Sequence, residues 1–174
     1  MTTKTAIQFI LLFFALVLIQ IIGSKILLFG LATPIIFIYL ILRLPINFSL
    51  SRTFTIAFFM GLVIDVFNNT PGMNALACTL LAAMRRPVFN AYFTRDDDDT
   101  GNPMPAIDTL GLGAYLKYMT TLVLAYSFMI FFIQAFSLGN VTLTLTRIAC
   151  SSALSILLIF GIDSLASTHR EKRL

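Results

Sequence analysis

The sequence has few of the side chains on which soluble enzymes depend. Tryptophan is absent, histidine occurs once, and only 11% of the 174 residues are charged. The single histidine, His169 in the C-terminal tail, cannot complete a Ser–His–Asp or Cys–His set. Motifs for zinc peptidases, P-loops and dinucleotide binding are also missing from the sequence. We therefore expect a non-enzymatic protein without a cofactor or a metal site.

Cysteines and acidic residues are also too few to suggest a metal site. Cys78 and Cys150 both lie inside apolar runs, where a lone cysteine acts as a small hydrophobic residue. A magnesium-diphosphate site of the D-D-x-x-D kind needs a second acidic cluster, and the sequence offers only one. We interpret that one run as a solvated loop and leave its contacts open; it consists of Asp96, Asp97, Asp98 and Asp99.

Long apolar runs make up most of the chain. A helix needs roughly 20 apolar residues to cross the ~30 Å hydrocarbon layer. The runs predict an all-α integral membrane protein, a single domain over residues 1–174 with six transmembrane helices, of which the third and fourth are short. The predicted spans are residues 6–22, 26–42, 53–67, 73–84, 118–136 and 141–165. The alternation of residues 141–147 is typical of a strand, but an unpaired strand is excluded in lipid, so we expect helix there.

Basic residues are concentrated in alternate gaps between these runs. If the N-terminus is cytoplasmic, the outer side retains only Lys25, with Arg147 inside the start of the last run. Lys and Arg are favoured in short cytoplasmic loops, so both termini are predicted to be cytoplasmic. The inner side then holds ten of the twelve basic residues: Lys4, Arg43, Arg52, Arg85, Arg86, Arg95, Lys117, Arg170, Lys172 and Arg173.

The largest gap between apolar runs is a predicted cytoplasmic loop at residues 85–117, which contains the acidic run. A short basic tail follows at residues 166–174. The basic residues form no continuous stripe that could follow a phosphate backbone, which argues against nucleic acid as a partner. Anionic lipid at the inner leaflet is a sufficient partner for them.

Asp65 is the most informative single residue, because a carboxylate inside a span is costly. Three interpretations are open: a hydrated residue at the interface, a buried residue, or part of a proton or ion relay. If it is buried, it would pair with Arg147 or contact the turn at residues 68–72. Asp163, at the other end of the last span, could face Arg43, Arg52 or Arg85.

Small residues recur every four positions in two of the predicted spans. Ala75, Thr79 and Ala83 have this spacing in the fourth span, and Ser151 and Ser155 have it in the sixth. Such spacing lets helices approach closely in lipid. The first span consists almost entirely of Ile, Leu, Phe and Val. We therefore expect the fourth and sixth spans inside the bundle and the first outside.

The middle of the chain resembles the rod shape-determining protein MreD family. The segments that carry the resemblance are Arg43-Leu44-Pro45, Gly61-Leu62-Val63-Ile64-Asp65 and Pro71-Gly72-Met73-Asn74-Ala75. Family members are similarly small and share a G-L-x-x-D segment followed, after a short turn, by G-x-x-A. Gly61, Asp65, Gly72 and Ala75 match that pattern, which implies roles in bundle packing and in shaping the outer turn.

The resemblance implies a scaffold subunit of the bacterial cell-wall elongation machinery in the inner membrane. It would bind a single-span MreC-like protein and other elongation proteins, and so help to couple cytoskeletal filaments to peptidoglycan synthesis. We expect the partner to meet helix 1 or another apolar face together with the outer turn at residues 68–74. Candidate partner or packing residues are Arg43, Gly61, Asp65, Asn68, Gly72, Asn74, Ala75 and Arg147.

The alternative is the substrate-binding membrane component of a vitamin-type transporter, whose fold the MreD family resembles. Polar residues of the last two spans would then surround an outward pocket. These residues are Tyr126, Gln134, Thr144 and Ser151. The same side chains could also form hydrogen bonds between helices, so the sequence leaves both interpretations open.

Overall fold

The computed structural model describes residues 3–25, 32–93, 105–135 and 141–171, and this part of the chain forms a helical bundle. Four helices are long and apolar enough to cross a membrane, over Ile7–Ser24, Leu50–Asn68, Leu112–Gln134 and Val141–Ser164. These features indicate a multi-pass membrane protein, as the sequence predicts. The helices are α1 (Thr3–Lys25), α2 (Tyr39–Arg43), α3 (Leu50–Asn68), α4 (Met73–Tyr92), α5 (Ile107–Leu110), α6 (Leu112–Ala135) and α7 (Val141–Glu171).

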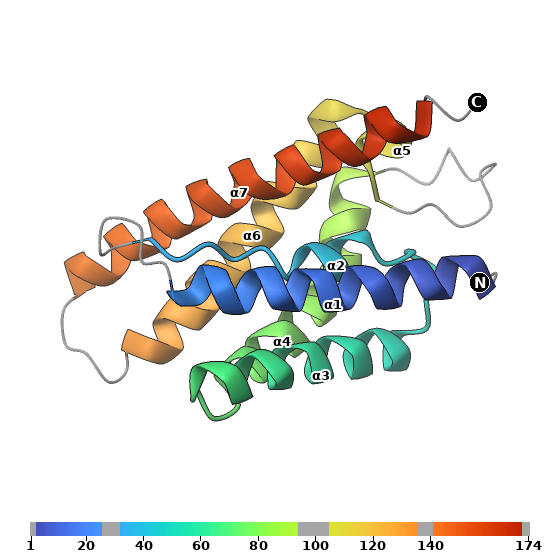
Figure 1. The fold of residues 1–174 in the computed structure, drawn as a ribbon. Helices are drawn as coiled ribbons and strands as arrows, with labels where there is room; N and C mark the ends of the chain where they lie inside the picture. The colour runs from blue at the N-terminus through green and yellow to red at the C-terminus, as the bar shows by residue number, and fades with distance from the viewer. Residues whose placement is uncertain (1–2, 26–31, 94–104, 136–140, 172–174) are drawn as a thin grey trace.

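The bundle has two distinct ends (Figure 1). At one end, α1 ends at Lys25, the turn of residues 69–72 joins α3 to α4, and α7 begins at Val141; we call this the turn end. At the opposite end, α1 begins and α7 ends, and we call this the terminal end. α6 packs against both α4 and α7, and its inward side chains are fully buried. α6 is therefore the central helix of the bundle, and α1 is peripheral, as predicted. The prediction that the sixth span lies inside is wrong, because only 22% of the α7 span is buried, against 44% of the α6 span.

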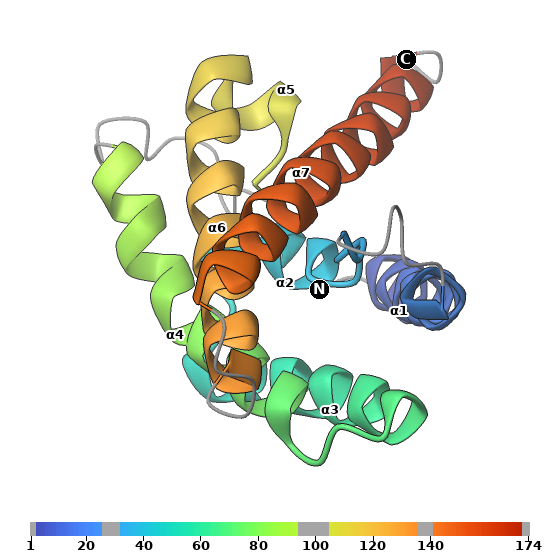
Figure 2. The same ribbon diagram turned by 90° about the vertical axis from the view of Figure 1, so that its left-hand side faces the viewer.

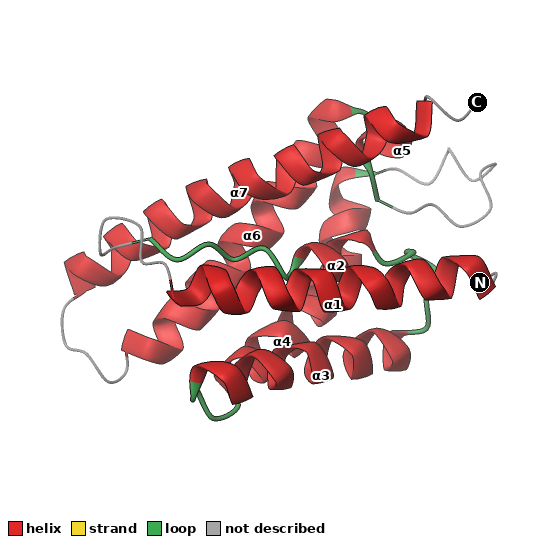
Figure 3. Ribbon diagram, viewed as in Figure 1, coloured by secondary structure: helices red, strands yellow, loops and turns green. Residues whose placement is uncertain are grey.

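The prediction of a helix over residues 26–42 is wrong. Residues 26–31 lie outside the described part of the chain, residues 32–36 are not helical, and a regular helix begins only at Tyr39. Pro34 explains the difference, because proline lacks the backbone N–H that a helix needs and pushes the preceding Thr33 out of the helical region. We call residues 32–36 the extended segment; a turn at residues 37–38 leads from it into α2. The extended segment lies between α1 and α7 in both views (Figure 2), and Figure 3 shows it as a loop inside the bundle.

The prediction that the third and fourth helices are short is also wrong. α3 has 19 residues and α4 has 20, because both continue past the apolar runs that marked them in the sequence. α4 passes through Arg85, Arg86 and Pro87, and Arg85 is only 1% exposed. A helix can thus continue through a buried arginine, beyond the residue at which its apolar run ends.

Much of the predicted loop at residues 85–117 is helical. Its start belongs to α4, its end belongs to α6, and α5 lies between them. The rings of Phe89 and Phe93 stack with their centroids 4.6 Å apart, and Tyr118 meets Phe89 edge-on. The acidic run at residues 96–99 lies outside the described residues. In the predicted tail, α7 continues to Glu171.

Candidate functional site

Asp65 joins the end of α3 to the start of α4. Its side chain is 4% exposed, and Oδ1 accepts hydrogen bonds from Thr70 Oγ1 (2.7 Å), the Asn74 backbone N–H (3.0 Å) and Asn74 Nδ2 (2.8 Å). Oδ2 accepts from the Ala75 backbone N–H at 2.9 Å. The first N–H groups of a helix lack partners within the helix, and its N-terminus favours negative charge. Asp65 therefore caps α4 across the turn.

The same hairpin depends on glycine at two positions. A Cβ atom on Gly61 would lie 2.5 Å from both the Cα of Ala75 and the backbone oxygen of Asn74, so only glycine allows α3 and α4 to approach this closely. Gly72 has φ +76°, a left-handed conformation that glycine adopts without a steric penalty. We call Gly61, Asp65, Gly72 and Ala75 the hairpin staple. Gly61 and Asp65 on α3 both meet Ala75 on α4, and Gly72 lies in the turn between the two helices.

Two asparagines link the hairpin to the rest of the bundle. Asn74 Oδ1 accepts a hydrogen bond from the hydroxyl of Tyr126 on α6 at 2.7 Å, and both residues are buried. Asn68 Oδ1 accepts one from Ser24 Oγ on α1 at 2.9 Å. The turn end is therefore held by polar contacts among α1, α3, α4 and α6. Such contacts are a main source of specific helix packing in lipid.

Side chains of α1 and α7 satisfy the backbone of the extended segment. Gln20 Nε2 donates to the Pro34 carbonyl oxygen at 2.7 Å, and the Ile36 N–H donates to Gln20 Oε1 at 2.8 Å. On the other side, the Thr33 N–H donates to Ser151 Oγ (3.1 Å), and the Ile35 N–H donates to Ser155 Oγ (2.9 Å). Non-helical backbone at membrane depth is tolerated only where protein surrounds it and supplies such partners.

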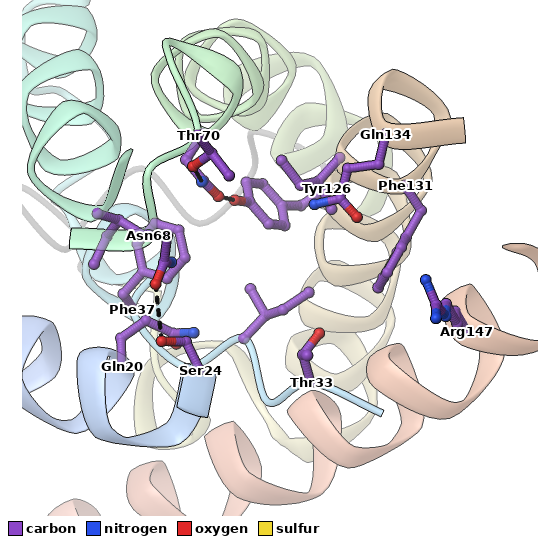
Figure 4. Close-up of a pocket in the computed structure, with 14 residues that line it drawn as sticks. Gln20, Ser24, Thr33, Phe37, Asn68, Thr70, Tyr126, Phe131, Gln134 and Arg147 are labelled. Atoms are coloured by element: carbon purple, nitrogen blue, oxygen red, sulfur yellow. Dashed lines mark hydrogen bonds between the residues drawn. The ribbon is translucent and has the colours of Figure 1, made fainter. Parts of the chain in front are cut away.

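The extended segment, the hairpin and α6 surround a cavity of about 410 Å³ at the turn end (Figure 4). Its lining combines amides, hydroxyls and apolar side chains, and among the described residues Arg147 is the only charged one in it. Amides and hydroxyls are typical of sites that orient a small ligand. The lining residues are Gln20, Ser24, Thr33, Ile35, Phe37, Ile64, Asn68, Thr70, Asn74, Tyr126, Ile130, Phe131, Gln134 and Arg147.

The three interpretations of Asp65 can now be compared. Its burial contradicts a hydrated interfacial residue, and its hydrogen bonds confirm the contact with the turn. In the described part of the chain it forms no ion pair with Arg147, and nothing tests the relay. Of the transporter residues, Tyr126 and Gln134 line the cavity, whereas Ser151 accepts a bond from the extended segment. Thr144 is not among the lining residues.

The terminal end contains a separate buried charge cluster. Arg43 Nη1 lies 3.1 Å from Asp163 Oδ1, so Arg43 is the arginine that pairs with Asp163. The Tyr39 hydroxyl donates to the same carboxylate oxygen at 2.7 Å and accepts from Arg43. The Ile107 N–H donates to Asp163 Oδ2 at 3.3 Å. This cluster ties α2, α5 and α7 together at the end of the bundle opposite the cavity.

Sequence reasoning missed Gln20 and the extended segment, and it predicted Ser155 only as a small residue that lets helices approach closely. The available signals were Thr33-Pro34 within an apolar run and Gln20 as the single polar side chain in residues 9–22. Among the described residues, no group of three or more His, Cys, Asp or Glu side chains is placed to hold a metal ion. Comparison of the chain with known protein families, curated proteins and solved structures found no match.

Proposed function

We propose that this protein is a non-enzymatic scaffold subunit of the bacterial cell-wall elongation machinery in the inner membrane. It binds a single-span MreC-like partner and helps to couple cytoskeletal filaments to peptidoglycan synthesis. The hairpin staple is the observation that supports this function. Gly61 packs against Ala75, Asp65 accepts a hydrogen bond from the Ala75 N–H, and Gly72 lies in the turn that joins the two helices. The four residues that carry the resemblance to the MreD family therefore lie in one hairpin.

The proposed topology has six crossings with both termini in the cytoplasm. The described chain passes along the bundle through α1, residues 32–43, α3, α4, α6 and α7 in turn, and residues 32–38 of the second crossing are not α-helical. Arg43 precedes α3, Arg52 lies in its first turn, and Arg85 and Arg86 follow the apolar part of α4, so all four belong to the parts of the chain near the terminal end. This distribution supports a cytoplasmic terminal end.

An apolar groove between α1 and α3 supports partner binding. It encloses about 350 Å³, and its polar lining is confined to Thr55, whose hydroxyl bonds to the Ser51 carbonyl of its own helix. Without a hydrophobic driving force between helices in lipid, a partner helix must fit closely. We propose that the partner's single span lies in this groove. The remaining lining residues are Phe9, Ile10, Phe13, Phe14, Leu40, Leu44, Ile56 and Phe59.

Affinity purification from native membranes in mild detergent tests this function. We expect the wild-type protein to recover a single-span periplasmic coiled-coil protein together with wall synthases. Thr55→Trp fills the groove and should lose that partner, whereas Leu157→Trp, on a 70% exposed position of α7, should retain it. Absence of such a partner from the wild-type sample, or its equal recovery by both variants, would contradict the proposal.

The second candidate is the substrate-binding component of a transporter, and the polar cavity favours it. Under the proposed topology the cavity lies toward the outer side, where a captured substrate would enter. Recovery of an ATPase pair with a coupling membrane subunit, in place of wall synthases, would select this function.

A further inference from the structure

We propose that the cavity at the turn end binds a small molecule that carries an oxyanion, either a carboxylate or a phosphate. The argument depends on charge. Arg147 contributes a cation to the lining, while no aspartate or glutamate among the described residues lines the cavity. The inference names a ligand class for the second candidate function, but it does not depend on which protein partners the chain has.

Arg147 lacks a counter-charge in the described part of the chain. Its Nε atom is buried without a hydrogen-bond partner, and no described carboxylate lies within ion-pair distance. The side chain as a whole is half-buried, and an anion with hydrogen-bond acceptors would compensate the part of the guanidinium that is removed from water. Arginine presents its N–H donors in a planar fork that matches carboxylate and phosphate oxygens. A bound oxyanion would supply what the protein does not.

Asp65, the acid predicted as a partner for Arg147, is already engaged. Both of its carboxylate oxygens accept hydrogen bonds from the hairpin, and the side chain is not part of the cavity lining. The staple therefore holds the negative charge at the start of α4 and leaves the cation of α7 unpaired. In Figure 4, Arg147 and Asn68 appear on opposite sides of the space, with Tyr126 and Gln134 between them.

The rest of the lining determines what else the ligand should carry. The amides of Asn68 and Gln134 can bind polar groups, while Phe37 and Phe131 offer apolar contact. A volume of about 410 Å³ is in the range of small-molecule sites. The cavity thus suits a small amphipathic anion. A lipid headgroup or a free metabolite could supply this chemistry.

Binding to purified protein in detergent tests the inference. The probes are benzoate, inorganic phosphate and dihexanoylphosphatidylglycerol, each titrated by calorimetry, with benzamide as the neutral counterpart of benzoate. We expect at least one anion to bind and benzamide to bind about tenfold more weakly than benzoate, because a charged hydrogen bond is lost. Preference for the lipid would indicate a headgroup, and preference for benzoate or phosphate would indicate a free ligand.

Two variants locate the site. Arg147→Gln should weaken binding of the preferred anion about tenfold or more. Arg52→Gln removes an exposed arginine at the terminal end and should leave binding unchanged. Failure of all three anions to bind wild-type protein, or equal binding by Arg147→Gln, overturns the inference. Equal binding of benzamide and benzoate by the wild-type protein also overturns the inference. This comparison does not depend on whether any variant folds. Unchanged recovery of the single-span partner by Arg147→Gln would leave the scaffold function standing.

Discussion

Replacement of Asp65 should open the hairpin between α3 and α4. Asp65→Ala removes four hydrogen bonds at once and leaves two backbone N–H groups at the start of α4 without their acceptor. Asp65→Asn retains one acceptor oxygen. If that oxygen takes the place of Oδ1, the amide nitrogen faces the Ala75 N–H, donor against donor. The two variants should therefore differ in severity, and Asp65→Asn tests the hydrogen bonds with almost no change in side-chain size.

The magnitudes follow from the hydrogen bonds. Loss of one bond to a charged group costs about 1.5–3 kcal/mol, and an unsatisfied buried donor costs about 1–3 kcal/mol. These costs are not additive, so we expect about 2 kcal/mol for Asp65→Asn and about 4 kcal/mol for Asp65→Ala. Val66→Ala, at the next position and 69% exposed, should cost no more than about 0.5 kcal/mol.

Cys78 offers a direct assay of this opening. Its thiol is fully buried on α4, one turn beyond Ala75, and the other cysteine can be removed as Cys150→Ser. When opening is faster than labelling, the rate of maleimide labelling follows the fraction of open hairpin. At 1.36 kcal/mol per tenfold change, labelling should accelerate about 30-fold in Asp65→Asn and about 1,000-fold in Asp65→Ala.

The comparison with Val66→Ala decides the outcome. That control should label within about twofold of the parent rate. If Asp65→Ala labels no faster than Val66→Ala, the carboxylate does not hold the start of α4. If Asp65→Asn matches Asp65→Ala, the loss of charge rather than the number of acceptors sets the stability of the hairpin.

Three further substitutions test other contacts. Gly61→Ala introduces a methyl group 2.5 Å from α4 backbone atoms and should cost about 1–3 kcal/mol in the same labelling assay, whereas Gly113→Ala, with open space around it, should cost nothing. Arg43→Met should lower stability in SDS titration by about 3–5 kcal/mol because it leaves Asp163 buried and unpaired; additional replacement of Asp163 by Leu should restore part of the loss. Gln20→Leu removes two hydrogen bonds from the extended segment and should lower thermal stability in detergent by about 2–4 kcal/mol; an unchanged melting temperature would contradict its bridging role.

The helices and the Asp65 contact with the turn were predictable because their causes are local. Apolar runs of sufficient length mark helices, and a carboxylate just before a turn has nearby N–H donors. The C-terminal end of α4 was less predictable. A hydropathy criterion ends the helix at Arg85, but a long side chain that is itself buried lets the helix continue to Tyr92.

The extended segment could not be predicted from hydropathy, because it is buried on all sides and is as apolar as a lipid-facing helix. Its partners Ser151 and Ser155 are about 120 positions away in the sequence. The small-xxx-small spacing on α7 predicted a close helix neighbour, and the spacing instead admits an extended backbone. Whether a helix or an extended backbone packs against these serines depends on Pro34 in the approaching segment, and not on the serines themselves.

The distance along the chain between the extended segment and α7 also delays the formation of their hydrogen bonds during synthesis. Thr33 and Ile35 are translated 118 and 120 residues before the serine hydroxyls that accept their N–H groups. At about 5–20 residues per second, those partners emerge roughly 6–24 s later. Until then, the segment would leave backbone groups unpaired in lipid. We expect the extended segment to stay in contact with the insertion machinery until α7 has been made. The segment would then enter the lipid only when its hydrogen-bond acceptors are present, and not in the order in which the chain is translated. Site-specific crosslinking from position 35 to the insertion machinery, in stalled chains that end before and after residue 155, would test this. The crosslink should be present in the shorter chains and lost in the longer ones.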